Sequence, residues 1–544
     1  MFDVSRTFMH LLKCFVVTFI IAIVTRTYYQ NKKCKLEEQA LIAQHGCQPV
    51  LATLPYKWPF AIDLLKLQYD ALPEGRLLEF QTKYLEIAPT LRFDILGTGF
   101  VTTDPANIEA ITNSRSEDFI LGSRRKGLYP LLGEGIFTQD GLAWKHSREI
   151  LRRQFARVRE GRLGALEPHA TELTRAIAME AKENPVGIVD LQPHCFEYTL
   201  GTTTDLLFGE SHSSLPQTSR QSLRDDFDYA VMVSALRLRL CDFAWLYNPK
   251  RFREACRGIR EWASYFADKA INYIEDNGED STKNKYAFIG DLWRSLKDRT
   301  LVRDQLLHVL IAGRDTTACL MSWTFKSFHL VRNPPLLDRL KEEINTVFQS
   351  DDQEITRNDI QKLPFLSCCL KESMALTCFL PVNQRYAARD TVLPRGGGPD
   401  GTSPILLRKG NGVGWSAYHL HRRETLYGPD AKEYLPDRWA SGELIRKVGL
   451  GSGFLDFHAG PRVCLGSKLF HSQVGFSYMP TTMLIGVFVE DYALMEASYG
   501  IIRVLQKYPS MKLPPGIPNL PVGGEKQNMT LVLSSADGVK VLLA

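Results

Sequence analysis

The segment Phe457-His458-Ala459-Gly460-Pro461-Arg462-Val463-Cys464-Leu465-Gly466 is the most informative part of this chain. It places one cysteine in a turn bounded by two glycines, with an arginine two residues before it. Glycine lets a backbone curl close to a flat molecule, because it tolerates positive φ and carries no side chain. Backbone N–H groups aimed at a sulfur favour its thiolate form. A thiolate in a tight loop, beside a cation, suits the axial position of a heme iron.

The spacing F-x-x-G-x-R-x-C-x-G resembles the heme loop of the cytochrome P450 monooxygenases. The resemblance implies that Cys464 is the axial ligand of the iron in heme b. The other cofactor contacts that it implies in this loop are Arg462, for a heme carboxylate, and Phe457, Gly460 and Gly466. The alternative is a buried structural cysteine beside a surface turn.

Length and composition are those of a globular protein with a large core. The chain has 544 residues, of which 44% are hydrophobic and 23% charged. The P450 resemblance implies a mainly α fold with a smaller β region, in one catalytic domain over residues 61–544 that follows a basic, proline-containing hinge over residues 29–60. The basic residues behind the net charge of +5 are scattered, which argues against nucleic acid as a partner. Eleven cysteines without regular spacing fit a reducing compartment rather than a disulfide framework.

Residues 1–28 are predicted to anchor the chain in a membrane. Phe, Leu, Ile and Val dominate residues 8–24, and no small-x-small cleavage site follows. Four basic residues come next: Arg26, Lys32, Lys33 and Lys35. Because such positive charge stays on the cytoplasmic side, we expect a single-pass anchor in the endoplasmic reticulum membrane and a cytosolic catalytic domain. A cleaved signal peptide or an interfacial helix are the alternatives.

Two further positions are candidates for binding heme carboxylates. Trp144 and Arg148 lie four residues apart in a predicted helix, hence on one face, where an indole N–H and a guanidinium can share a carboxylate. In the P450 family this W-x-x-x-R pair holds a heme propionate; a cation–π pair on a solvated face is the alternative. Arg385 matches a family position that reaches the second heme carboxylate, and the alternative is an ordinary surface arginine.

A long helix is predicted over residues 303–328, and it contains Ala312-Gly313-Arg314-Asp315-Thr316-Thr317. Glycine in mid-helix costs about 1 kcal/mol against alanine, so we expect a local distortion with a purpose. Small side chains at Ala312 and Gly313 would leave room for a diatomic ligand. The segment resembles the oxygen-activation motif of the P450 family, A-G-x-D-T-T, in which Thr316 would hydrogen-bond dioxygen and Asp315 would supply protons. The alternative is a plain helix kink.

The chain departs from the family pattern E-x-x-R, because Ala375 stands where arginine is expected after Glu372. In relatives this Glu and Arg form a buried network with a further arginine, which is Arg438 here. Glu372 is therefore predicted to pair with Arg438 in a network that has lost one member. Removing a partner from a buried charged network costs about 3–5 kcal/mol, which puts folding or heme retention in question.

Residues 471–491 depart from the pattern a second time. They separate the cysteine loop from Tyr492-Ala493-Leu494-Met495-Glu496-Ala497, which resembles the continuation of the helix that follows the ligand in relatives. The insertion is either a family-specific loop or a gene-model error. Two hairpins are also predicted: one around the glycine run 393–401 with a strand at residues 404–407, and one joining residues 530–533 to 539–543.

The resemblance is closest to the fungal branch that hydroxylates alkanes and fatty acids. Three segments support this: residues 130–138, residues 393–401, and residues 427–431 ahead of Pro436-Asp437-Arg438-Trp439. The implied function is insertion of one oxygen atom from O2 into a lipophilic substrate, namely a fatty acid, an alkane or a hydrophobic secondary metabolite. Electrons would come from NADPH through NADPH–cytochrome P450 reductase, since the chain has no flavin or nicotinamide fingerprint of its own.

Two other classes of function remain open. One is a heme-thiolate isomerase or dehydratase that needs no reductase; the intact Asp315-Thr316 pair argues against it. The other is a degenerate, non-catalytic membrane protein, favoured by Ala375 and the insertion and opposed by the complete cysteine loop.

Overall fold

The computed structural model describes residues 32–33, 35–95, 97–160, 163–210, 217–278, 286–326, 331–466, 492–518, 520 and 523–543. The predicted anchor and the insertion at residues 471–491 therefore lie outside the described residues. Within the ranges described, the search for a helix that is both long and apolar enough to cross a bilayer finds none.

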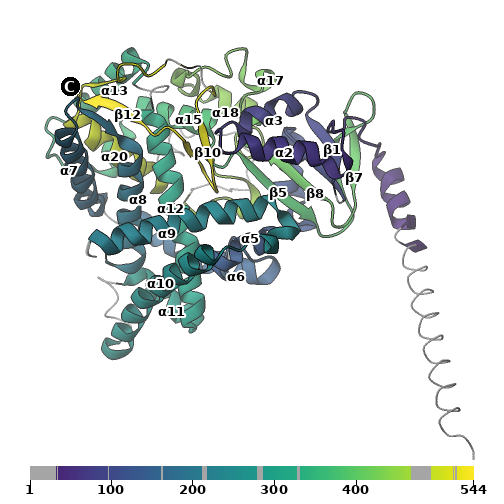
Figure 1. Ribbon diagram of the computed structural model, residues 1–544, viewed down its shortest axis with the longest axis horizontal. Coiled ribbons are helices and arrows are strands. Elements are labelled where there is room, and N and C mark those ends of the chain that lie inside the picture. The colour runs from purple at the N-terminus through teal and green to yellow at the C-terminus, as the bar shows by residue number, and fades with distance from the viewer. Residues whose placement is uncertain are drawn as a thin grey trace, which may run out of the picture.

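Helices make up most of the molecule, as expected, and a smaller sheet region lies at one side (Figure 1). The longer helices are α2 (Ile62–Ala71), α3 (Leu77–Leu85), α5 (Arg124–Leu132), α6 (Gly141–Glu160), α7 (Glu167–Glu183), α8 (Leu191–Phe208), α9 (Gln217–Arg239), α10 (Lys250–Asn277), α11 (Ala287–Leu296), α12 (Arg299–Phe325), α13 (Pro334–Val347), α15 (Pro364–Thr377) and α20 (Tyr492–Lys507). The shorter ones are α4 (Pro105–Glu109), α14 (Arg357–Gln361), α16 (Ala417–Leu420), α17 (Glu424–Tyr427) and α18 (Glu443–Val448).

The largest sheet has the strand order β1-β2-β8-β5-β3. Its strands are β1 (Thr90–Asp94), β2 (Thr98–Thr102), β8 (Gly412–Ser416), β5 (Val382–Ala387) and β3 (Phe119–Ile120). β2 and β8 run parallel, while the other neighbours are antiparallel. The sheet matters for function because β5 carries Arg385 at a buried position.

The remaining strands form three small sheets: β6 (Thr391–Gly397) with β7 (Ser403–Leu407), β10 (Gln527–Met529) with β11 (Leu533–Ser535), and β4 (Ile188–Asp190), β12 (Lys540–Leu543) and β9 (Met511–Lys512) together. The hairpin predicted around residues 393–407 is confirmed by the pairing of β6 with β7. The second predicted hairpin is wrong: β11 pairs with β10, and β12 pairs with β4 and β9 instead. β11 forms a local hairpin with the strand before it, which leaves β12 to pair with strands earlier in the chain.

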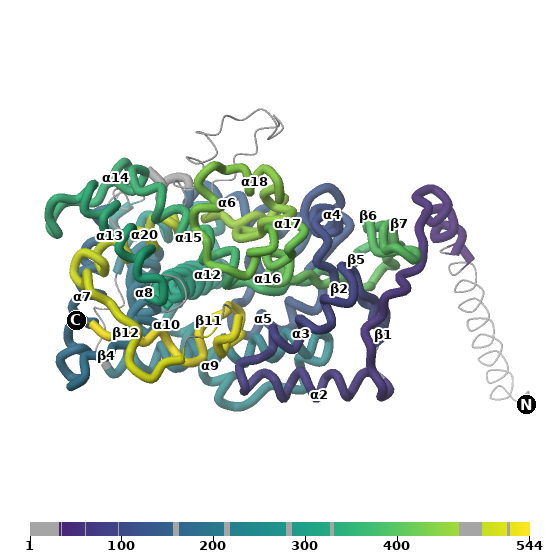
Figure 2. The backbone as a smooth tube through the Cα atoms, turned by 90° about the horizontal axis from the view of Figure 1, so that it is seen from above, coloured from purple at the N-terminus to yellow at the C-terminus, as the bar shows by residue number. Residues whose placement is uncertain are grey.

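Helix α12 lies between two hydrophobic cores and belongs to both. Its residues Val302–Ile311 pack in the core with α9, α10 and α11, and Ala318–Phe325 pack in the core with α15 and α20. Figure 2 shows α12 in the middle of the helical part, with α9 and α15 on opposite sides. Asp298 caps its first turn by accepting from the N–H of Leu301 at 3.0 Å. The predicted long helix is thus present.

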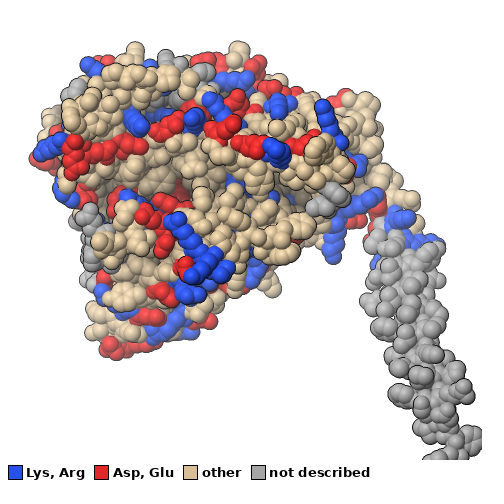
Figure 3. Space-filling model, viewed as in Figure 1, with Lys and Arg blue, Asp and Glu red and all other residues tan. Residues whose placement is uncertain are grey.

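Surface charge is mixed on the face drawn in Figure 3, where Lys and Arg lie among Asp and Glu rather than in a separate stripe. The charges that matter for function are the buried ones described next.

Candidate active site

The cysteine loop is a tight turn held by its own backbone. The N–H of Cys464 donates to the carbonyl of Phe457 at 3.0 Å, and the N–H of Val463 donates to that of Gly460 at 3.0 Å. Gly460 has φ of 63° and lies against the carbonyl of Thr112, so no side chain fits there. The loop thus leaves the Cys464 side chain exposed.

Gly466 keeps the space beside the sulfur open. A side chain at this position would place its Cβ 3.6 Å from Cys464 Sγ, in direct contact. The two glycines that bound the turn therefore have different tasks: Gly460 allows the backbone its course, and Gly466 leaves the sulfur accessible.

Trp144 lies between two arginines rather than on a solvated face. It is 8% exposed, the guanidinium of Arg462 lies 4.3 Å from its ring centroid, and that of Arg148 lies 5.7 Å away. Arg148 donates to the carbonyl of Val463 at 2.6 Å, next to the cysteine. Arg462 donates to Asp140 at 2.7 Å. The structure thus brings the predicted W-x-x-x-R pair to the cysteine loop.

Arg385 is 6% exposed, which excludes the surface-arginine alternative. It donates to Asn383 Oδ1 at 3.0 Å, and Arg124 donates to the same oxygen at 3.3 Å. The second guanidinium nitrogen of Arg385 lies 3.2 Å from His458 Nε2. Burial lowers the pKa of His458 to about 3, with Arg385 adding to the effect, so its neutral ring accepts from Arg385.

Arg124, Arg148, Arg385 and Arg462 form what we name the cation cluster. Burial lowers the pKa of Arg124 and Arg462 to about 10, although Asp140 raises both. For Arg385 burial lowers the pKa well below its usual value, and Arg124 and Arg462 lower it further. Nε of Arg124 is buried without a hydrogen-bond partner. The carboxylate of Asp140 acts on Arg124, Arg385 and Arg462, so among the described residues the cluster carries more positive than negative charge.

Such an excess of buried positive charge is costly unless an anion completes it. The two carboxylates of heme supply that charge at the required place, beside an exposed cysteine sulfur. The described residues therefore fit heme. The sequence analysis did not identify Arg124 and His458 as site residues. For Arg124 the available signal was its place in the largely apolar segment of residues 119–138.

On α12, Thr316 and Asp315 have different surroundings. Thr316 Oγ1 donates to the carbonyl of Ala312, four residues earlier, at 2.7 Å. Asp315 is 2% exposed and pairs with Arg314 at 3.1 Å. Burial raises the pKa of Asp315 to about 6, against Arg314, which lowers it. Asp315 therefore titrates close to neutral pH.

Arg314, which sequence reasoning also passed over, joins Asp315 to the surface. It is 2% exposed, lies about equally far from the rings of Phe196 (5.2 Å) and Phe227 (5.0 Å), and pairs with Asp228 of α9 at 2.6 Å. The side chain of Asp228 is 57% exposed. Two carboxylates, one buried and one in solvent, thus share one guanidinium.

Two expectations for α12 are wrong. The helix is continuous from Arg299 to Phe325, so no distortion marks Gly313. A side chain at Gly313 would place its Cβ 2.8 Å from Thr203 Oγ1 on α8. This glycine therefore makes room for a neighbouring helix, not for a diatomic ligand.

The carboxylate of Glu372 is buried, and both of its oxygens have partners although Ala375 replaces the expected arginine. Its two oxygens accept from the N–H of Leu435 at 2.8 Å and from Trp439 Nε1 at 2.6 Å, and Arg438 Nε lies 3.2 Å away. Burial raises its pKa to about 7, while Arg438 lowers it. The structure thus forms the predicted Glu372–Arg438 pair. The predicted deficit is not visible at Glu372, because backbone and indole donors complete the site.

His421 connects the helix of Glu372 to the cysteine loop. Its Nδ1 lies 3.1 Å from the carbonyl of Ala375, and its Nε2 accepts from the N–H of Leu455 at 3.0 Å. Burial lowers its pKa to about 3, which keeps the ring neutral, with one nitrogen as donor and the other as acceptor. The sequence did not predict this link, because neither His421 nor Leu455 belongs to a recognisable motif.

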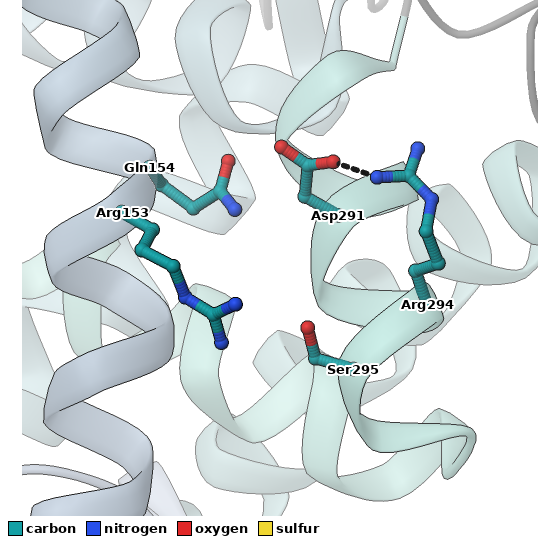
Figure 4. Close-up of a pocket in the computed structure, with 5 residues that line it drawn as sticks. All are labelled: Arg153, Gln154, Asp291, Arg294 and Ser295. Atoms are coloured by element: carbon teal, nitrogen blue, oxygen red, sulfur yellow. Dashed lines mark hydrogen bonds and ion pairs between the residues drawn. The ribbon is translucent and has the colours of Figure 1, made fainter.

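A polar pocket of about 220 Å³ lies between α6 and α11 (Figure 4). Arg153 and Gln154 of α6 face Asp291, Arg294 and Ser295 of α11 across it, and Arg294 donates to Asp291. Arg148, which contacts the cysteine loop, lies more than a helical turn earlier on α6. None of the residues that line the pocket belongs to the cysteine loop or to the cation cluster.

Comparison with known proteins agrees with this geometry. The model of the cytochrome P450 family matches residues 53–477. Cytochrome P450 52A13 of Debaryomyces hansenii is 35% identical over 520 residues, which cover 92% of this chain and 93% of the relative. Cytochrome P450 52A5 of Candida maltosa is 37% identical over 490 residues, 86% of each chain. A cytochrome P450 of Arthroderma benhamiae is 33% identical over 536 residues, 96% of this chain and 97% of the relative. The chain belongs to the cytochrome P450 family, the monooxygenases that bind heme b through a cysteine thiolate.

Proposed function

We propose that this protein is a membrane-bound hydroxylase of fatty acids or alkanes, with Cys464 as the heme ligand. The observation that carries the cofactor assignment is the cation cluster beside the cysteine loop, whose positive charge exceeds the negative charge of Asp140 among the described residues. The substrate class follows from the resemblance to the fungal branch that oxidises such chains. A hydrophobic secondary metabolite is the other lipophilic substrate that fits.

Heme with an axial thiolate supplies the activation of dioxygen, since the thiolate favours O–O cleavage. The protein holds this group by its carboxylates. Arg462, Arg148 and Trp144 meet at one side of the cysteine loop and suit one carboxylate; Arg385 and Arg124, joined through Asn383, suit the other. Guanidinium groups bind carboxylates through paired, charge-assisted hydrogen bonds.

Asp315 and Thr316 deliver protons on the distal side. Asp315 titrates near neutral pH, so its carboxyl can both hold and release a proton under working conditions. Arg314 joins Asp315 to Asp228, whose side chain is exposed to solvent. Thr316 Oγ1 donates to the carbonyl of Ala312, and rotation of that hydroxyl would free it to donate to dioxygen.

Membrane attachment through residues 1–28, in the endoplasmic reticulum, suits a substrate that partitions into lipid. Exposed apolar side chains on two described elements support such contact: Trp58 and Ile62 beside or in α2, and Trp245 and Leu246 in a 3-10 helix after α9. Tyr69 of α2 is close enough to Arg239 and Cys241 for its pKa to respond to both. The two elements are therefore neighbours, and together they offer an amphipathic surface.

Electrons are proposed to come from NADPH–cytochrome P450 reductase, docked on the side of the cysteine loop. The first test is the carbon monoxide difference spectrum of the reduced protein. We expect the red-shifted band of thiolate-ligated heme in the wild type and in Cys47→Ser, and its loss in Cys464→Ser. Retention of that band in Cys464→Ser would overturn the ligand assignment.

The reaction is tested with reductase, NADPH and a series of alkanes and fatty acids of increasing chain length. We expect hydroxylated product that requires NADPH. Product formation from a peroxide without reductase, and none with it, would assign the protein to the isomerase or dehydratase class instead. A correctly folded protein that retains heme and converts none of these compounds would point to a secondary metabolite.

A further inference from the structure

The loop between α5 and α6, residues 133–140, is bound to α12 by two buried side chains one helical turn apart. Asp304 Oδ2 accepts from the N–H of Glu134 at 2.9 Å, and His308 Nδ1 accepts from the N–H of Phe137 at 3.3 Å. Asp304 is 3% exposed and His308 is fully buried. We name this pair, Asp304 and His308, the α12 latch.

Two glycines of the loop fit against the latch. A side chain at Gly135 would place its Cβ 2.6 Å from Nε2 of His308, closer than real contacts allow. Gly135 does not have a left-handed backbone, so the imidazole alone demands glycine there. Gly133 lies against the carboxylate of Asp304 and also has φ of 69°. Thr138 closes the loop by donating to the carbonyl of Gly133 at 2.7 Å.

The same loop supports the cation cluster from its other side. Arg462 donates to the carbonyls of Ile136 and Gln139, at 3.4 and 3.1 Å, besides its bond to Asp140. The guanidinium of Arg124 lies 5.7 Å from the ring of Phe137. The loop that the latch holds on α12 therefore contacts two arginines of the cluster, Arg462 through its backbone carbonyls and Arg124 through the ring of Phe137.

We infer that Asp304 and His308 are positioning residues that fix residues 133–140 on α12 and thereby hold Arg462 and Arg124 in place for the heme carboxylates. The inference rests on the proposed role of these two arginines. Neither latch residue contacts the cysteine loop in any hydrogen bond of the described residues; both act through the loop backbone. His308 also shares a helix face with Ala312 and Thr316, four and eight residues later.

A double-mutant cycle tests the inference with Gly135→Ala, His308→Ala and the two combined. Gly164→Ala is the control, because a side chain there meets its nearest neighbour only at 3.9 Å. Two rates are measured: amide hydrogen exchange of residues 133–140 in protein without heme, and transfer of heme from the loaded protein to a heme-scavenging protein.

We expect Gly135→Ala to speed both rates at least tenfold, and Gly164→Ala to change neither. In the His308→Ala background the added methyl group should have no further effect, because the imidazole that it strikes is gone. Additive effects of the two substitutions, or a wild-type rate in Gly135→Ala, would overturn the latch. Faster loop exchange with an unchanged rate of heme transfer would overturn the positioning role. If Cys464 proved not to bind heme, the exchange data would still decide whether the latch exists.

Discussion

Two groups of buried charges, one around Glu372 and one in the cation cluster, are built differently. The carboxylate of Glu372 has a complete set of partners: Arg438 lies 3.2 Å from it, and Trp439 and Leu435 donate to its two oxygens. In the cation cluster Asp140 acts on three of the four guanidinium groups, those of Arg124, Arg385 and Arg462. A buried carboxylate with its cation and donors in place stabilises the fold by itself. A buried excess of positive charge indicates that a ligand brings the compensating negative charge.

The largest effect on stability is expected at Arg438. Replacement by methionine leaves the carboxylate of Glu372 buried without its cation, so we expect Arg438→Met to lower the free energy of unfolding by about 3–5 kcal/mol. Urea unfolding should show the same loss with and without heme, because this group serves the fold. Arg339→Met removes an exposed pair with Asp437 and should cost no more than about 1 kcal/mol. A loss of unfolding free energy confined to the heme-loaded protein would contradict the assignment of the Glu372 group to the fold.

Glu496 is a buried carboxyl that forms no ion pair among the described residues. Thr202 donates to it, and burial raises its pKa to about 7. Unfolded glutamate ionises near pH 4.3, so the wild type loses stability as the pH rises from there through 7. Glu496→Gln stays neutral and should gain about 3 kcal/mol over the wild type at pH 8, with no gain near pH 4.5. Denaturant unfolding across this range measures the difference.

The exposed Glu172, paired with Arg175 on α7, provides the control for that experiment. Glu172→Gln should give a difference from the wild type that does not grow with pH. Equal stability of Glu496→Gln and the wild type at pH 8 would show that the Glu496 carboxylate is solvated or paired.

Substitution of Arg385 tests the role of the cation cluster. Methionine there removes a buried cation that a heme carboxylate would complete, so Arg385→Met should weaken heme binding tenfold to hundredfold, or about 1.5–3 kcal/mol. The free energy of unfolding of the protein without heme should stay the same or rise, because one uncompensated charge has gone. Heme titration and urea unfolding of the same preparation measure the two quantities. A loss of stability without heme, with unchanged heme affinity, would make Arg385 structural.

The smallest effect on the cofactor is expected at Ala375. Its side chain is 3% exposed within the hydrophobic core, and Glu372 already has its partners. Ala375→Arg should therefore bring no gain in heme retention, and overpacking should lower the free energy of unfolding by about 1–3 kcal/mol. Slower heme loss in Ala375→Arg than in the wild type would show that the network does lack its third member.

The mainly α fold followed from the family resemblance, whereas local patterns in the sequence were enough to predict the long central helix and the turn around Cys464. Each depends on residues close together in the chain, where spacing and glycine content carry the information. The pairing of Glu372 with Arg438 came from the family resemblance. The contacts of Arg124, His421, Asp304 and His308 join segments up to hundreds of residues apart, which no local pattern encodes. Gly313 shows the same limit, since its neighbour is Thr203 on another helix.

The distribution of thiols has a practical consequence for labelling chemistry. Burial raises the pKa of Cys195, Cys256 and Cys378 to about 12, and it raises those of Cys319, Cys368 and Cys369 as well, so all six react slowly with alkylating reagents near neutral pH. Cys464 is exposed, in a loop that also contacts Arg148. Alkylation followed by peptide mapping would therefore mark this position in protein without heme and spare it once heme covers the sulfur, giving a footprint of cofactor occupancy that needs neither spectroscopy nor turnover.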